Sequence, residues 1–118
     1  MKNMKINQLV VGVCQTNCYI INNKDTNEAM IVDPGDQAED ISMRCRMLGV
    51  VPKAILLTHG HFDHMMAAGK LKEEFHIPIY AAEKEVPLLA DARANLSAMW
   101  ARPVCIKPDC LVKEGDEL

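Results

Sequence analysis

The sequence predicts an α/β fold built on one mixed sheet, and two features of the chain lead to this prediction. Apolar runs of strand length alternate with segments in which apolar residues recur every three or four positions, the spacing of one helix face. Polar turns separate these segments. The 118 residues allow one small domain, which we place at residues 1–118.

The first third of the chain is predicted to form three strands, over residues 6–13, 17–22 and 29–33. The polar segment 23–27 reads as a turn between the last two strands, so an antiparallel meander is the simplest arrangement. We expect Pro34 to stop the third strand and Gly35 to allow the sharp bend that follows.

A helix is predicted after this bend. Asp36 and Glu39 have the spacing of an N-cap residue and its reciprocal partner. The apolar face of the helix is then marked by Ala38, Ile41, Cys45 and Leu48. Gly49 is placed to end it.

Strands and helices are predicted to alternate further along the chain. The uninterrupted aliphatic run 54–58 reads as a buried strand, and the apolar spacing from Met65 to Phe75 predicts a helix close behind it. A short strand at 77–81 precedes a helical stretch at 83–94, in which Pro87 must lie in the first turn or cause a kink.

Composition argues against several classes of protein. With 13 basic and 16 acidic side chains the formal net charge is −3, so we expect no nucleic-acid partner. The apolar runs are far too short to span a bilayer, and the N-terminus lacks the apolar core of a signal peptide. We therefore expect no membrane partner and a cytoplasmic location.

The five cysteines are expected to be reduced thiols. Neither Cys14 and Cys18 nor Cys105 and Cys110 have the two-residue gap of the commonest zinc-knuckle or redox pairs. A zinc ribbon is the less favoured alternative.

The heptapeptide from Thr58 to His64 is the densest cluster of polar donors, because it holds three of the four histidines and a carboxylate. Histidine and carboxylate are common ligands of zinc, iron and manganese. His59 and His61 leave the strand two residues apart, so both can face one ion. Asp63 and His64 follow the bend and could hold a second ion. The alternative is a surface loop with coincidental histidines.

This string resembles the His-x-His-x-Asp-His signature of the metallo-β-lactamase superfamily, and its initial Thr resembles the glyoxalase II-like hydrolases, also called hydroxyacylglutathione hydrolase-like. The resemblance implies two zinc ions per complete site, with iron or manganese as possible replacements. It assigns His59 and His61 to the first metal and Asp63 and His64 to the second. Asp63 would also orient a metal-bound hydroxide and is the catalytic candidate. His61 in place of Glu argues against the flavodiiron branch.

Two other segments extend the resemblance. The run from Thr16 to Ile21 resembles the second strand of glyoxalase II-like proteins. Asp33-Pro34-Gly35 resembles their turn, in which the Asp lies behind the metal site. Asp33 and Thr58 are therefore candidates to support the ligands from behind, although a plain turn-forming role for Asp33 is an equal alternative.

The family pattern also contains ligands with no matching position here. A third His for the first metal, a bridging Asp and a final His for the second would follow the C-terminal strand and turn at 110–118. The resemblance thus covers the whole chain, while the chain covers about half of the family's αββα sandwich: one sheet with its flanking helices, as a truncated N-terminal part.

The apolar pattern of the strands has a consequence for association. Successive apolar residues, as at Ile20 and Ile21 or at Ile55 and Leu56, indicate that both faces of the sheet need cover. In the family fold a second sheet provides it. We therefore expect a homo-oligomer, or a complex with the missing half-domain.

Three functions are consistent with these features. The first is a metal-dependent hydrolase that acts on a small-molecule thioester or related ester and is incomplete in this chain. The second is a non-enzymatic half-domain that self-associates and binds metal weakly or not at all. The third is an oxidoreductase resembling the persulfide dioxygenases, which share the motif and use one iron.

Overall fold

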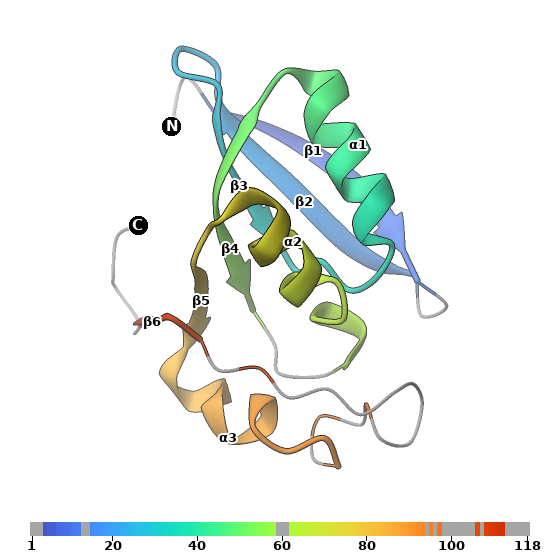
Figure 1. Ribbon diagram of the computed structural model, residues 1–118, viewed down its shortest axis with the longest axis vertical. Coiled ribbons are helices and arrows are strands. Elements are labelled where there is room, and N and C mark those ends of the chain that lie inside the picture. Colours follow the sequence, from blue (N-terminus) through green and yellow to red (C-terminus); the bar gives the residue numbers. More distant parts are fainter. Residues whose placement is uncertain are drawn as a thin grey trace.

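One mixed sheet organises the part of the chain that the computed structural model describes, residues 4–12, 15–58, 62–93, 95, 97, 106 and 108–112 (Figure 1). Its strands are β1 (Met4–Val11), β2 (Thr16–Asn23), β3 (Glu28–Val32), β4 (Val51–Leu57), β5 (Ile79–Ala82) and β6 (Cys110–Val112). They lie in the order β1-β2-β3-β4-β5-β6. The first three strands pair antiparallel, which confirms the predicted meander, and β3 to β6 pair parallel.

Strand β4 begins at Val51, earlier than the aliphatic run 54–58 predicted. Burial alternates along it, with Lys53 exposed and Ile55 and Leu57 buried, so its first half lacked the continuous apolar signal. The register against β3 shifts by one residue: Ala29 faces Pro52, while Met30 faces Ala54. Lys53 is therefore the extra residue of a β-bulge.

Helices α1 (Ala38–Leu48) and α2 (Ala68–Phe75) lie side by side on one face of the sheet (Figure 1). Each connects neighbouring parallel strands, so the shared right-handed crossover places both on the same side. Ile41, Cys45 and Leu71 are fully buried against the sheet. Gly49 ends α1 in the left-handed conformation with φ 71°, as predicted.

The predicted N-cap of α1 is wrong. Gln37 holds the cap position with φ 58°, and no side chain caps the helix. Asp36 Oδ1 instead accepts a hydrogen bond from the Gln37 N–H at 2.8 Å. The Gln37 side chain accepts from Gly12 N, just after β1, at 2.8 Å and donates to Asp40 of α1 at 2.7 Å, and these two contacts replace the expected pair of Asp36 and Glu39.

The helical stretch predicted at 83–94 is also shorter in the structure. A 3₁₀ turn, η2 (Glu83–Glu85), leads into the four-residue helix α3 (Val86–Leu89), with Pro87 in its first turn as expected. The Asp91 carboxylate accepts a hydrogen bond from Arg93 N at 2.9 Å. Such local side-chain bonds compete with the helical ladder, which accounts for the early end.

The two faces of the sheet differ in burial. Ile20, Ile31 and Ile55 point toward the helices and are fully buried. The neighbours on the other face are less covered, and Ile6, which pairs with Ile21, is 66% exposed. The apolar surface that we expected to need cover therefore lies on this second face, around β1 and β2.

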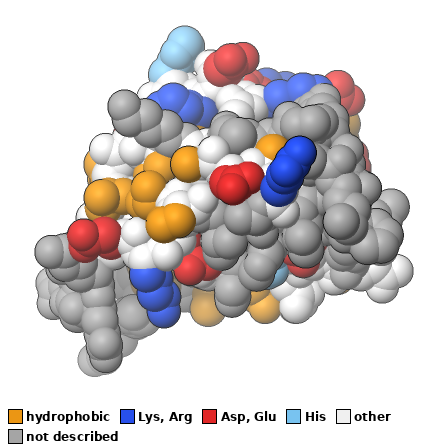
Figure 2. Space-filling view, turned by 90° about the horizontal axis from the view of Figure 1, so that it is seen from below, with side chains coloured by type: hydrophobic (Ala, Val, Ile, Leu, Met, Phe, Trp, Pro, Cys, Tyr) orange, Lys and Arg blue, Asp and Glu red, His pale blue; other side chains and the backbone are white. Residues whose placement is uncertain are grey.

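The described surface carries charges of both signs. Figure 2 shows the end of the molecule that is lowest in Figure 1, where basic and acidic side chains are interspersed beside a group of hydrophobic ones. No helix in the described segments combines the length and apolar character that crossing a membrane requires.

Exposure of the second sheet face predicts self-association. Apolar area removed from water stabilises by about 25 cal/mol per Å², so we expect a second copy to cover β1 and β2. Ile6→Glu should weaken association at least about tenfold, because burial of one Ile side chain is worth roughly 1.5–3 kcal/mol. Sedimentation velocity or light scattering measures this effect.

Met47→Glu is the matched control, because Met47 is also an exposed apolar residue, 75% accessible, but belongs to α1. It should leave association unchanged. A parent protein that sediments as a single monomer contradicts the expectation.

Thiol reactivity should follow burial. Cys18, Cys45 and Cys110 are free, as predicted, whereas Cys14 and Cys105 lie outside the described residues. Burial raises the pKa of Cys18 to about 12 and of Cys45 to about 11. Under native, mildly alkaline conditions we expect iodoacetamide to label half-buried Cys110 first, and Cys18 and Cys45 only after denaturation. Peptide mass spectrometry reads the order. Equal native labelling of all three would contradict it.

Candidate metal centre

The candidate site lies at one edge of the sheet. Strands β3 and β4 are parallel neighbours, so the residues that follow them, Asp33 and Thr58, leave the sheet side by side. Strand β2 runs antiparallel to β3, which brings its first residue, Thr16, to the same edge. A 3₁₀ turn after β4, η1 (Phe62–His64), supplies Asp63 and His64.

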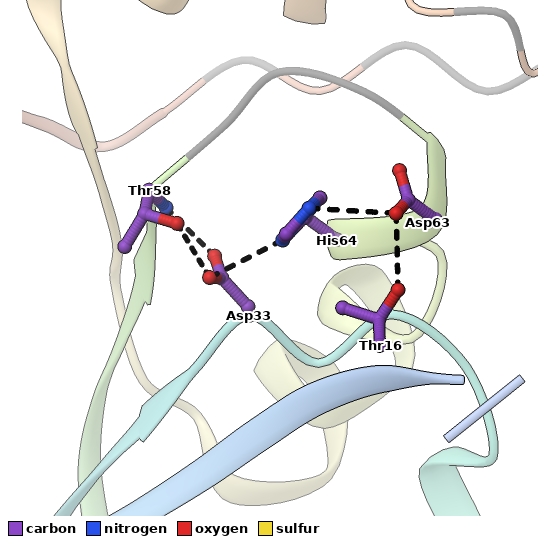
Figure 3. Close-up of polar contacts among 5 residues, drawn as sticks. All are labelled: Thr16, Asp33, Thr58, Asp63 and His64. Atoms are coloured by element: carbon purple, nitrogen blue, oxygen red, sulfur yellow. Dashed lines mark hydrogen bonds and ion pairs between the residues drawn. The ribbon is translucent and has the colours of Figure 1, made fainter. Parts of the chain in front are cut away.

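Asp33 ties the ends of β3 and β4 together (Figure 3). Its Oδ1 accepts a hydrogen bond from Thr58 N at 2.7 Å, and its Oδ2 accepts one from Thr58 Oγ1 at 2.5 Å. The backbone N–H of Asp33 donates to Leu56 O at 2.9 Å. Asp33 is buried and has φ 51°, a left-handed conformation that Asp tolerates better than most residues.

The His64 imidazole lies between two carboxylates (Figure 3). Its Nδ1 is 3.3 Å from Asp33 Oδ2, and its Nε2 is 3.4 Å from Asp63 Oδ2. The close contact of its Nδ1 with the Asp33 carboxylate raises the pKa of His64, as do the charges of Asp33 and Asp63, while burial opposes this rise. Asp33 thus engages one ring nitrogen and leaves the other turned toward Asp63.

Asp63 is also held from β2. The Thr16 hydroxyl donates a hydrogen bond to Asp63 Oδ2 at 3.0 Å, across 47 positions of the sequence. This contact places a neutral donor beside a carboxylate, a pairing stronger than one between two neutral groups.

Close backbone packing joins the turn after β3 to the turn after η1. Met66 N donates to Gly35 O at 3.1 Å, and Ala67 N donates to Pro34 O at 2.9 Å. A Cβ on Gly35 would lie 2.0 Å from the carbonyl oxygen of Asp63. Residues 65–67 form a turn, and α2 begins at Ala68 and not at Met65.

Four of the predicted site residues, Asp33, Thr58, Asp63 and His64, meet at this edge. His59 and His61 lie outside the described residues, and their role as ligands stays a prediction. For Asp33 the structure shows both a turn with positive φ and contacts with Thr58 and His64. Thr16 was not among the predicted site residues. It is the first residue of β2, which begins at this edge of the sheet, and this position was a usable signal.

The described donors fit a divalent metal ion. A carboxylate on the inner nitrogen of a histidine is the usual support of a metal-bound imidazole. The His64 Nε2 then lies beside an Asp63 oxygen, and this is a nitrogen and oxygen pair suited to zinc, iron or manganese. Within the described residues alone, no group of three or more His, Cys, Asp and Glu side chains could hold a metal.

Comparison with known proteins identifies the family. The model of the metallo-beta-lactamase superfamily matches residues 11–116. The chain belongs to this superfamily. A probable metallo-hydrolase of Bacillus subtilis, YqgX, is 39% identical over 114 residues, which cover 96% of this chain and 53% of the relative. The hydroxyacylglutathione hydrolase GloC of Haemophilus influenzae is 37% identical over 100 residues, which cover 85% of this chain and 47% of GloC.

Solved structures of superfamily members agree with the fold. The B3 metallo-beta-lactamase BLEG-1 has a TM-score of 0.85 and 38% identity, with 97% of this chain and 56% of that chain covered. TTHA1623, solved in a di-iron-bound form, has a TM-score of 0.81 and 32% identity, with 95% and 56% covered. The chain therefore spans about half the length of the relatives it matches, as predicted.

Close contact at Gly35 predicts a specific sensitivity to substitution. Gly35→Ala forces the Asp63 backbone away from the turn, and we expect a loss of about 1–3 kcal/mol in unfolding free energy. Gly69→Ala in α2 is the control, because a Cβ there meets nothing within 4 Å. It should leave stability equal or raise it by up to about 1 kcal/mol. Urea unfolding followed by circular dichroism measures both; equal stabilities would contradict the close contact.

Proposed function

We propose that the chain forms part of a metal-dependent hydrolase that acts on a thioester or a related ester. The observation that carries this proposal is the placement of His64 between Asp33 and Asp63, the arrangement of a supported metal ligand. Superfamily membership and the hydrolase names of YqgX and GloC support the reaction type. The thioester preference comes from GloC, because a hydroxyacylglutathione is a thioester.

Each candidate residue then has a defined task. His59 and His61 would hold one ion, and Asp63 and His64 a second. Asp33 fixes the His64 ring through Nδ1. Its bonds to Thr58 hold the start of the histidine segment, which we define as residues 58–64, against β3. When bound, the metal ions lower the pKa of water toward neutrality and polarise the carbonyl that is attacked.

Zinc is the proposed metal, and iron is the main alternative. Imidazole and carboxylate ligands suit both metals, as well as manganese. TTHA1623, which is 32% identical, was solved with two irons. A site with iron that consumes oxygen in the presence of a persulfide would instead favour the oxidoreductase.

The complete site needs more ligands than the four proposed here. Catalytic zinc usually has three protein ligands and an open position for water, whereas the chain offers two candidates per ion. We propose that the remaining ligands come from additional polypeptide or from an associated copy. A half-domain that binds metal weakly or not at all is the competing function.

Asp63→Ala tests the proposal. The parent should retain zinc after dialysis against metal-free buffer, and the variant should retain about half as much because the second ion loses a ligand. Any metal-dependent hydrolysis of a hydroxyacylglutathione by the parent should be abolished in the variant, with little change in folding. Atomic emission, a thioester assay and circular dichroism measure these effects.

Asp25→Ala is the matched control, because Asp25 is an exposed carboxylate in the turn between β2 and β3. It should retain the metal content of the parent. A parent that retains no metal excludes an associated copy as the source of the remaining ligands and is the result expected of a non-enzymatic half-domain. An active parent whose Asp63→Ala variant hydrolyses at the same rate would refute the role of Asp63.

A further inference from the structure

The hydrogen bond from Thr16 to Asp63 joins the first residue of β2 to a turn 47 positions later. Thr16 is 7% exposed, so its hydroxyl is largely withdrawn from water. A buried hydroxyl is costly unless it has a partner, and its donation to the carboxylate supplies one. Sheet pairing needs only the backbone of Thr16, which faces Val11, so the side chain is available for this contact.

Asp63 is the less confined of the two carboxylates at the site. Its side chain is 28% exposed, whereas that of Asp33 is 8% exposed. The backbone of Asp63 is held against Gly35, but this packing leaves the side-chain torsions free. A partly hydrated carboxylate on a short turn has several staggered rotamers open to it, so its direction must come from side-chain contacts.

Within the described residues, both side-chain contacts of Asp63 involve the same oxygen. Oδ2 accepts from Thr16 Oγ1 at 3.0 Å and lies 3.4 Å from His64 Nε2. The other carboxylate oxygen points away from Thr16 (Figure 3). With both contacts in place, one rotamer of Asp63 is favoured, and the two carboxylate oxygens then face different sides of the site.

We propose that Thr16 is a positioning residue, which fixes the orientation of the Asp63 carboxylate before a metal ion binds. The proposal rests on the proposed function for its consequence, since an oriented Asp63 matters because it is a candidate ligand. Partners that orient metal ligands usually contribute about 10–100-fold to metal affinity, so the loss of this hydroxyl should be measurable.

Two substitutions separate positioning from packing. Thr16→Val keeps the branched shape and strand preference but removes the donor. Thr16→Ser keeps the hydroxyl and removes a methyl group. Thr26→Val is the matched control, because Thr26 lies in the exposed turn between β2 and β3, where its hydroxyl accepts a hydrogen bond from the nearby Glu28 N at 3.2 Å.

The first readout uses metal-free protein. Three-bond NMR couplings to the Asp63 carboxyl carbon report its χ1 angle; they should indicate one rotamer in the parent and in Thr16→Ser. In Thr16→Val they should move toward the average over several rotamers. Couplings in Thr16→Val identical to those of the parent would overturn the proposal, whether or not the protein binds metal.

The second readout is zinc affinity in competition with a chromophoric chelator. We expect Thr16→Val to weaken the ion that depends on Asp63 by about 10–100-fold, and Thr16→Ser and Thr26→Val to stay close to the parent. Equal affinities for Thr16→Val and the parent would overturn the proposal. A parent without zinc affinity would exclude an associated copy as the source of the remaining ligands, while the couplings still decide on positioning. Thermal unfolding of each metal-free variant checks that the fold is intact.

Discussion

The candidate site depends on the close approach of two backbone turns. Gly35 lies so near the Asp63 carbonyl that no side chain fits between them. Two backbone hydrogen bonds, from Met66 N to Gly35 O and from Ala67 N to Pro34 O, also join the turns. Because both turns follow neighbouring parallel strands, the sheet sets their separation. Side chains from three separate segments can then meet with little adjustment of their own. The contacts of Asp33, His64 and Asp63 are consequences of this backbone arrangement.

Much of this architecture could be predicted because its signals are local. The polar segment 23–27, Gly49 and the aliphatic run before Thr58 each specify their own structure through turn chemistry, left-handed propensity or burial. The histidine segment could likewise be identified by its residue types alone. The roles of Asp33 and Thr58 needed the resemblance to a family, because nothing near them in the sequence indicates a shared partner.

Two of the misses, the N-cap of α1 and Thr16, have one physical cause, which is contact with residues distant in sequence. Asp36 has the spacing of a cap, yet Gln37 occupies the N-cap position, and its side chain accepts a hydrogen bond from Gly12 N, just after β1. Thr16 escaped notice for the same reason, since its partner lies 47 residues away. Local sequence patterns specify individual helices and strands, whereas the contacts between them depend on the topology of the sheet.

The bulge at Lys53 has a consequence far from its own position. By looping out one residue, β4 can start beside the turn between β2 and β3 and still place Leu56 opposite Val32. Were Lys53 paired in the ladder, every later residue of β4 would move one step along β3 and turn to the opposite face. Thr58 would then pass beyond the reach of Asp33. The exposed Lys53, near the opposite end of β4, therefore preserves the register between β3 and β4 that brings Thr58 within reach of Asp33.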